Sequence, residues 1–339
     1  MRTIVISRFG VPEVLKIVER PVQKPDVDDV LIRVKAIGLN FADILARLGV
    51  YPNIPDPPFV PGLEFSGVVV SVGSKTKRVK KGDRVMGFTR QGAYAEYVCV
   101  RANQVHSIPQ RMTFVEAASI GVTYLTAFHG LVTLANMRKG ERVLIHAAAG
   151  GVGTAAIQLA KHYGAEVFAT ASSAQKLEIA RREGADHCIN YVEDDFARVI
   201  RRETDGYGID IVMDSVGGRI FRKGWKLLAP MGRYVLYGFA SITGKRRISK
   251  ALMLKEVLSV PPLFPPTLVS KNLGFFGFNL YFLGHKITYL RATINKLLRL
   301  YGQNKIKPVV GRTFPFEEVV SAHEHLQSRE SIGKVVLVI

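Results

Sequence analysis

The chain has 339 residues, of which 47% are hydrophobic, and its formal net charge is +19. This length is more than one ordinary domain needs, and two cysteines, Cys99 and Cys188, exclude a disulfide framework and a four-cysteine zinc site. The first residues lack the apolar run of a secretory signal, and no run of about 18 apolar residues predicts a membrane span. We therefore expect a cytoplasmic protein.

Residues 1–120 contain short apolar runs, such as 30–40, 65–73 and 93–100, separated by glycines and prolines. Five prolines between positions 52 and 61 indicate one long structured loop. Many short strands with this punctuation predict a compact, barrel-like β domain.

From about Phe114 the pattern changes to helical spacing, and then strands and helices alternate. A short buried strand at 142–147 precedes a helix over 154–164, and a strand at 166–171 precedes a helix over 174–185. Such alternation predicts βαβ units around a parallel sheet. We expect an α/β fold in which a Rossmann domain spans 121–281, flanked by a domain formed from 1–120 and 282–339.

The segment from Ile242 to Arg312 holds thirteen Lys and Arg side chains and one acid, Glu256. We treat residues 242–272 as a basic insert in the Rossmann domain. Its prolines predict that the run 258–269 forms neither a regular helix nor a central strand. This charge attracts an anion, either a phosphate-bearing cofactor or a membrane surface, and no nucleic-acid-binding motif accompanies it.

The apolar run 273–283 predicts one long strand at the edge of the sheet, and residues 286–302 predict a basic amphipathic helix. An exposed apolar edge strand needs cover. We therefore expect a homodimer in which this strand pairs with its copy.

A glycine-rich turn lies between the first Rossmann strand and the helix that follows. Glycines permit a tight turn and a close approach to a pyrophosphate, while the helix offers free N–H groups and the positive end of its dipole. The residues of this predicted cofactor turn are Ala147, Gly150, Gly151, Val152 and Gly153.

The choice between NAD and NADP depends on the residues about 20 positions further on, where an acid would hold the ribose 2′-hydroxyl. Ser172 and Ser173 stand there, and Lys176 follows. These side chains donate to a 2′-phosphate, which a carboxylate would repel. The sequence predicts NADPH, although a serine N-cap and a solvated lysine would give the same pattern.

The chain resembles the medium-chain dehydrogenase/reductase superfamily in a series of sequence motifs that follow one another in the same order. These motifs lie at 38–52, 60–73, 79–87, 92–97, 124–128, 146–153, 210–218 and 331–339. Within it, the chain is similar to the quinone oxidoreductase (zeta-crystallin-like) branch along almost its full length. Segments 38–52 and 305–327 look most like its vesicle amine transport protein subgroup. The resemblance implies a GroES-like catalytic domain combined with a Rossmann domain.

The resemblance also implies roles for single residues. Ser173, Lys176 and Tyr191 match positions that hold the 2′-phosphate, and Arg329 matches a phosphate-binding arginine near the C-terminus. Thr126 matches a threonine near the nicotinamide, and Gly238 ends a strand that passes the cofactor.

Zinc-using relatives have cysteine and histidine ligands where this chain has Asn40 and Leu63. A catalytic zinc needs about three nitrogen, oxygen or sulfur ligands from the protein, so we expect no metal.

Without a metal, the protein must position the substrate and stabilise a developing oxyanion by hydrogen bonds. The resemblance places Asn40 and Tyr51 beside the nicotinamide, and Tyr51 is also a candidate proton donor. The structural alternative is that Asn40 caps the following helix and Tyr51 packs on it. Leu45 and Ala46 replace bulkier, more polar residues of many quinone reductases, which favours a larger, more apolar substrate.

The sequence therefore favours a zinc-free, NADPH-dependent reductase of quinones or α,β-unsaturated carbonyls. A second hypothesis is a peripheral membrane or lipid-handling protein that uses an oxidoreductase scaffold, since a fold does not settle a function. The basic insert is then either a lid over the site or a contact with an anionic membrane surface.

Overall fold

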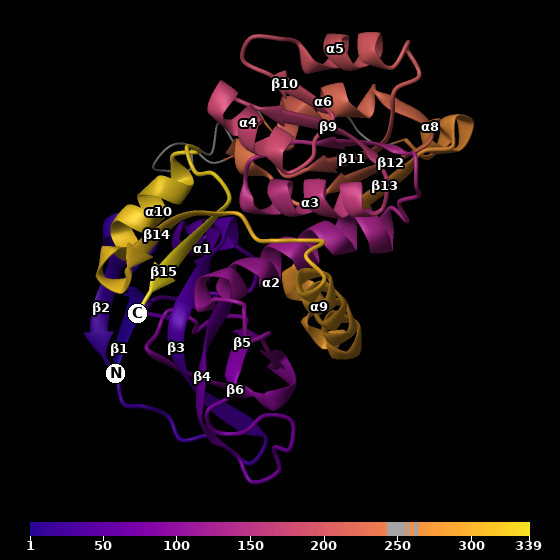
Figure 1. The fold of residues 1–339 in the computed structure, drawn as a ribbon. Helices are drawn as coiled ribbons and strands as arrows, with labels where there is room; N and C mark the ends of the chain where they lie inside the picture. The colour runs from indigo at the N-terminus through magenta and orange to yellow at the C-terminus, as the bar shows by residue number, and fades with distance from the viewer. Residues whose placement is uncertain (243–253, 255, 257, 261–263) are drawn as a thin grey trace. The chain divides into compact units, whose positions relative to one another are not determined.

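The computed structural model describes residues 1–242, 254, 256, 258–260 and 264–339 (Figure 1). The chain divides into two compact units. The first comprises Met1–Leu125 and Tyr281–Ile339, and the second holds the described residues between Thr126 and Leu280. Several basic residues of the predicted insert lie outside the described residues: Lys245, Arg246, Arg247, Lys250 and Lys255.

The first unit is built on a seven-stranded sheet with the order β14-β15-β3-β4-β5-β7, in which β6 also pairs with β3. A separate hairpin is formed by β1 (Arg2–Ile6) and β2 (Leu15–Glu19). The remaining strands are β3 (Asp29–Leu39), β4 (Glu64–Val72), β5 (Arg84–Phe88), β6 (Tyr97–Arg101), β7 (Val105–Ser107), β14 (Val310–Pro315) and β15 (Lys334–Val338). The helices are α1 (Phe41–Arg47), the start of α2 (Phe114–Phe128), α9 (Ile287–Gly302) and α10 (Val319–Gln327).

Strand β3 organises this unit, because its β-branched residues alternate into the core and it has three antiparallel partners. Val30, Ile32 and Val34 are completely buried. The C-terminal strand β15 pairs with the end of β3, where Val336 lies opposite Gly38. Residues from both ends of the chain therefore meet beside the start of α1.

The described residues of the second unit form six parallel strands in the order β10-β9-β8-β11-β12-β13, which is the doubly wound Rossmann order. This confirms the predicted α/β fold class. The strands are β8 (Arg142–Ile145), β9 (Glu166–Ala171), β10 (His187–Asn190), β11 (Ile209–Asp214), β12 (Leu228–Leu236) and β13 (Gly274–Gly277). The helices are α3 (Gly151–His162), α4 (Ala174–Arg182), α5 (Phe196–Glu203), α6 (Gly218–Trp225) and α8 (Pro265–Lys271).

Helices lie on both faces of this sheet. Figure 1 shows α3 on one side and α5 and α6 on the other. Phe196 of α5 and Phe221 of α6 pack in one core cluster with Phe168 of β9. Helices α3 and α4 end before Gly164 (φ +80°) and Gly184 (φ +108°), the left-handed positions at which glycine commonly terminates a helix.

Two sequence predictions about 258–283 are wrong. The run 273–283 does not form one strand, because β13 ends at Gly277, opposite Leu236, where its only described neighbour β12 also ends. A 3-10 helix follows (η5, Leu280–His285). The prolines do not prevent a helix either. Pro265 and Pro266 begin α8, because first-turn positions need no backbone N–H.

The predicted helix after Phe114 is present. It runs as α2 and continues as a π-helical segment, η3 (His129–Leu134). By length and composition alone, Phe114–Leu134 would suffice to cross a membrane, but 78% of its most apolar window is buried inside the protein. Such burial is typical of a core helix.

Candidate functional site

The predicted glycine turn lies between β8 and α3 in the second unit. Gly150 is the N-cap of α3 and has no side chain to cap it, so the N–H groups of the first turn are offered outward. A Cβ on Gly153 would lie 2.4 Å from the carbonyl oxygen of Ala147, and Ala147 itself has φ +52°. The turn is therefore as tight as the predicted pyrophosphate site requires.

The predicted 2′-phosphate residues follow the neighbouring strands. Because the carboxyl ends of parallel strands share one edge of a sheet, the segments after β8, β9 and β10 lie side by side there. Ser172 and Ser173 follow β9, and Tyr191 follows β10, with its N–H bonded to the carbonyl of Ala171 at 3.1 Å. Ser173 caps α4 by accepting from the backbone N–H of Lys176 at 3.4 Å.

Three further predicted cofactor residues are Gly238, Thr126 and Arg329. Gly238 follows β12 at the same edge, where a Cβ would lie 2.8 Å from the carbonyl oxygen of Ser215. Thr126 is buried on α2. Arg329 lies in the first unit, after α10, at φ +65°. Every predicted cofactor residue except Arg329 therefore belongs to the second unit, and all of these but Thr126 lie in segments at the carboxyl edge of its sheet or in the turn before α3.

Asn40 lies in the first unit, between β3 and α1, and its side chain is fully engaged. The amide Nδ2 donates to the carbonyl of Gly38 at 3.1 Å and to Glu64 Oε1 at 3.0 Å, while Oδ1 accepts from Lys334 Nζ at 2.6 Å. The side chain is only 8% exposed. Both amide hydrogens therefore already have acceptors inside the protein.

Glu64 and Lys334 form an ion pair at the base of this arrangement, and both are almost completely buried. The second carboxylate oxygen of Glu64 accepts from the backbone N–H of Val122 at 2.8 Å. The Glu64 cluster, defined as Asn40, Glu64 and Lys334, thus ties β4, β15 and α2 to the start of α1. An ion pair buried this deeply is stable only when such hydrogen bonds satisfy its remaining groups.

A second buried chain begins at Asp43. Its Oδ2 accepts from the backbone N–H of Asn40 at 2.8 Å and from the Tyr94 hydroxyl at 3.3 Å. The Tyr94 hydroxyl also lies 3.1 Å from His323 Nε2. Burial raises the pKa of Asp43 to about 7 against the opposing hydrogen bond from Asn40, and burial lowers the pKa of His323 to about 3. Asp43 therefore exchanges its proton near neutral pH.

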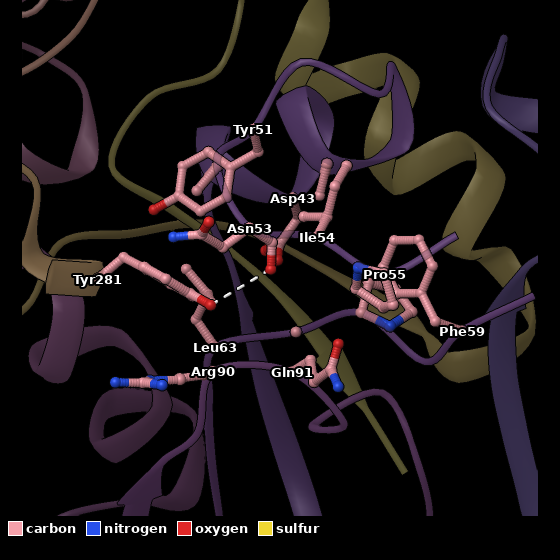
Figure 2. Close-up of a pocket in the computed structure, with 14 residues that line it drawn as sticks. Asp43, Tyr51, Asn53, Ile54, Pro55, Phe59, Leu63, Arg90, Gln91 and Tyr281 are labelled. Carbon is pink, nitrogen blue, oxygen red and sulfur yellow. Dashed lines mark hydrogen bonds between the residues drawn. The ribbon is translucent and has the colours of Figure 1, made fainter. Parts of the chain in front are cut away.

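A cavity of about 430 Å³ opens above this chain in the first unit (Figure 2). The proline-rich loop after α1 and the turn after β5 form most of its wall. Its lining residues are Ala42, Asp43, Ala46, Tyr51, Asn53, Ile54, Pro55, Phe59, Pro61, Gly62, Leu63, Arg90, Gln91 and Tyr281. Tyr51 lines this cavity, whereas Asn40 does not. The pair predicted to flank the substrate is therefore divided between the cavity wall and the buried cluster.

Tyr51 meets Tyr281 edge to face, with ring centroids 5.9 Å apart. The Tyr281 hydroxyl donates to the carbonyl of Asn53 at 3.3 Å, which is the hydrogen bond drawn in Figure 2. Ala46 and Leu63 leave this part of the wall apolar. The cavity thus combines an apolar body with a few hydrogen-bonding groups, the usual character of a small-molecule site.

Sequence reasoning missed several residues of this region. Lys334 carried one weak signal, a lysine at the start of an otherwise apolar strand. Arg90, Tyr94 and Tyr281 carried none, because their positions in the site depend on contacts between distant segments. Among the residues that the structure describes, no group of three or more His, Cys, Asp or Glu side chains is placed to hold a metal ion.

Comparisons with known proteins cover the whole chain. Residues 26–110 match the family described as alcohol dehydrogenase GroES-like domain, and residues 151–277 match the family described as zinc-binding dehydrogenase. The synaptic vesicle membrane protein VAT-1 homolog of Rattus norvegicus is 40% identical over 100% of this chain and 84% of its own length.

Two solved structures are also similar. The Escherichia coli quinone oxidoreductase complexed with NADPH has a TM-score of 0.88 and 31% identity, and the match covers 100% of both chains. The CurK enoyl reductase has a TM-score of 0.85 and 32% identity, and the match covers 99% of this chain and 98% of that one.

Proposed function

The chain belongs to the medium-chain dehydrogenase/reductase superfamily, in the branch of the quinone oxidoreductases and VAT-1 homologues, and we propose that it reduces quinones or α,β-unsaturated carbonyls with NADPH and without zinc. An oxidoreductase fold is the premise, and the cofactor and substrate class are the proposal. The observation that carries it is the glycine turn at the start of α3, beside Ser173 and Lys176 rather than beside an acid.

The residues at the carboxyl edge of the second unit fit a nicotinamide dinucleotide. The N–H groups at the start of α3 would hold its pyrophosphate, and Ser173, Lys176 and Tyr191 would hold the 2′-phosphate. A bound reduced nicotinamide would supply the reducing equivalents. Arg329 and Thr126 are retained as proposed contacts on the strength of the family resemblance.

The first unit would bind the substrate. Its cavity has apolar, aromatic and hydrogen-bonding groups on the wall, and Tyr51 is proposed to donate a hydrogen bond, and then a proton, to the substrate oxygen. Because both amide hydrogens of Asn40 have acceptors, we assign Asn40 to holding the start of α1 in place. The small Ala46 leaves room for a bulky, hydrophobic substrate.

The direct test is a spectrophotometric screen of NADPH and NADH oxidation against quinones, enones and aldehydes. We expect oxidation of NADPH with at least one quinone or enone, and little with saturated aldehydes. Elemental analysis should find no stoichiometric zinc, and chelators should leave the rate unchanged. Oxidation that requires zinc, or the absence of oxidation with every quinone and enone, would overturn the proposal.

A second candidate function is peripheral binding to an anionic membrane surface from the cytoplasm. It is favoured by exposed apolar side chains on and beside α8, such as Phe264 (61% exposed) and Val269 (77% exposed), next to Lys271. Flotation with anionic and neutral liposomes at low and high salt tests it. Absence of binding to anionic vesicles at low salt, or binding unchanged when Lys245, Arg246 and Arg247 become Glu, would remove it.

We also retain the proposal of a homodimer. Strand β13 is the terminal strand of the described sheet, and its outer edge is available for pairing with a second copy. Sedimentation at micromolar concentration should give the mass of two chains, whereas a monomer there would contradict this arrangement.

A further inference from the structure

Among the residues that the structure describes, Arg90 is the one arginine or lysine side chain on the wall of the cavity. It lies in the turn after β5, and hydrogen bonds to the neighbouring loop fix this turn. The N–H of Thr89 bonds to the carbonyl of Leu63 at 2.9 Å, and the N–H of Gly92 bonds to the carbonyl of Val60 at 3.0 Å. The guanidinium therefore extends from a fixed backbone.

Contacts with η5 hold the guanidinium itself. It lies 5.3 Å from the centroid of the Tyr281 ring, and Nη2 donates to His285 Nε2 at 3.2 Å. The missing side chain of Gly284 makes room for it, since a Cβ there would lie 3.3 Å from Nη2. Arg90 is thus oriented before any ligand arrives, which lowers the entropic cost of binding.

No carboxylate among the described residues pairs with Arg90. Other arginines of the chain are paired, such as Arg233 with Glu141 and Arg142 with Glu166. The guanidinium offers five N–H donors, and its single hydrogen bond within the described residues goes to the ring nitrogen of His285. A fixed guanidinium without an anionic partner, on the wall of a cavity, is suited to an oxyanion of a ligand.

The rest of the cavity decides what kind of anion fits. Tyr51, Tyr281, Phe59 and Ile54 give it apolar and aromatic walls. Asp43 is the one carboxyl group among the described residues of its wall, and burial raises the pKa of this group to about 7, so it is partly protonated near neutral pH. A small inorganic ion would leave these apolar walls uncovered, whereas an amphipathic molecule would cover them.

We infer that the substrate is a hydrophobic enone or quinone that bears a carboxylate, and that Arg90 binds this carboxylate. The inference rests on the proposed function and narrows its substrate class. Arg90 then determines specificity through substrate affinity, and the reducible carbonyl lies on the side of Tyr51.

The test compares para-carboxybenzylideneacetone with its methyl ester, which has the same enone and no charge. For the unchanged protein, kcat/KM should be about tenfold or more higher for the acid, because a charge-assisted hydrogen bond is lost with the ester. Arg90→Gln should remove this preference through KM and leave the ester unaffected. Arg90→Lys should keep part of it, and Gly284→Ala should weaken it by displacing the guanidinium.

Arg101→Gln is the matched control, since it removes one positive charge from an exposed position on β6, away from this cavity. It should leave kcat/KM unchanged for both the acid and the ester. NADPH affinity and the thermal midpoint should stay the same in all variants. The inference would be overturned if Arg90→Gln lowered kcat/KM equally for the acid and the ester, or if it lowered the affinity for NADPH.

Calorimetry with the saturated ketone of the carboxylate probe separates the two proposals, because it needs no turnover. Binding that Arg90→Gln abolishes supports the carboxylate site even if neither enone is reduced, and only the proposed function then fails. Reduction of both enones at equal rates, with no Arg90-dependent binding of the saturated acid, leaves the function and removes the carboxylate site.

Discussion

The two units of the chain build their parts of the site from different chemical groups. In the second unit, the glycine turn, the capped start of α4 and the turn at Gly238 present mainly backbone groups at one edge of a sheet. In the first unit, Glu64, Lys334 and Asp43 are buried ionisable side chains. Substitutions beside a site formed by backbone groups can change ligand affinity without unfolding the unit. Substitutions of buried charged residues, in contrast, also lower the stability of the unit.

The largest effect should come from Glu64→Ala. It leaves the Lys334 ammonium buried without its counter-charge and removes an acceptor from Asn40, so the free energy of unfolding should fall by about 3–5 kcal/mol. The control in the second unit is Glu166→Ala, which breaks a partly exposed pair with Arg142 and should cost about 1 kcal/mol or less. Chemical denaturation of both variants measures the difference, and equal losses would refute the contrast between the units.

Lys176→Ala should change affinity and leave stability alone. Loss of a charge-assisted phosphate contact is worth about 1.5–3 kcal/mol, so the affinity for NADPH should fall about tenfold or more, with little change for NADH. The control is Arg182→Ala at the other end of α4, which should affect neither cofactor. Titration of both cofactors gives the result. An equal loss of affinity for NADPH and NADH would mean that Lys176 does not contact the 2′-phosphate.

Asp43 should give the first unit a distinctive dependence on pH. Its folded pKa of about 7 lies above its ordinary value of 3.8, so the folded state holds a proton that the unfolded state releases between these values. The stability that Asp43 contributes should therefore fall as pH rises through this window, by on the order of 2 kcal/mol between about pH 5 and pH 8. Below about pH 6.5, His323 acts with the opposite sign, because its pKa is lowered to about 3.

The free energies of unfolding of the unchanged protein and of Asp43→Asn are compared at each pH, because the contribution of the histidines is the same in both and cancels in the difference. The difference in unfolding free energy should shift in favour of the asparagine variant as pH rises. Asp195→Asn in the second unit should shift the difference in the opposite direction, and only below the ordinary pKa of 3.8, because the hydrogen bond from Lys223 holds the pKa of that carboxyl below this value. If the curves of unfolding free energy against pH were parallel for Asp43→Asn and the unchanged protein, Asp43 would not titrate in this range.

The same contrast explains what the sequence could predict. The glycine turn and the serine cap are local patterns, so strands 142–145 and 166–171 and the helices after them could be placed from spacing alone. The Glu64 cluster joins three segments that are far apart in the chain, and no local pattern encodes that contact.

Neighbouring elements also decide details that a sequence window does not contain. Strand β13 stops where β12 stops, although the apolar run continues to Leu283. The prolines at 265 and 266 begin a helix because they fall in its first turn. The cavity likewise depends on Tyr281 meeting Tyr51 and Arg90, which the helical and strand periodicities do not predict.

The smallest expected effect belongs to Tyr51→Phe, and it separates packing from chemistry in the first unit. The edge-to-face contact with Tyr281 needs only the ring, so phenylalanine should keep it and the free energy of unfolding should stay the same. Loss of the hydroxyl removes the proposed donor to the substrate oxygen. A neutral hydrogen bond is worth about 0.5–1.5 kcal/mol, so turnover should fall up to about tenfold with NADPH affinity unchanged. The control is Tyr281→Phe, which loses its hydrogen bond to the carbonyl of Asn53 and should affect KM more than turnover. Steady-state kinetics with each accepted enone or quinone decides between the two roles. Unchanged turnover for Tyr51→Phe with all of them would leave Tyr51 as a packing residue and would move the proton donor to Asp43, a carboxyl group on the cavity wall whose pKa burial raises to about 7.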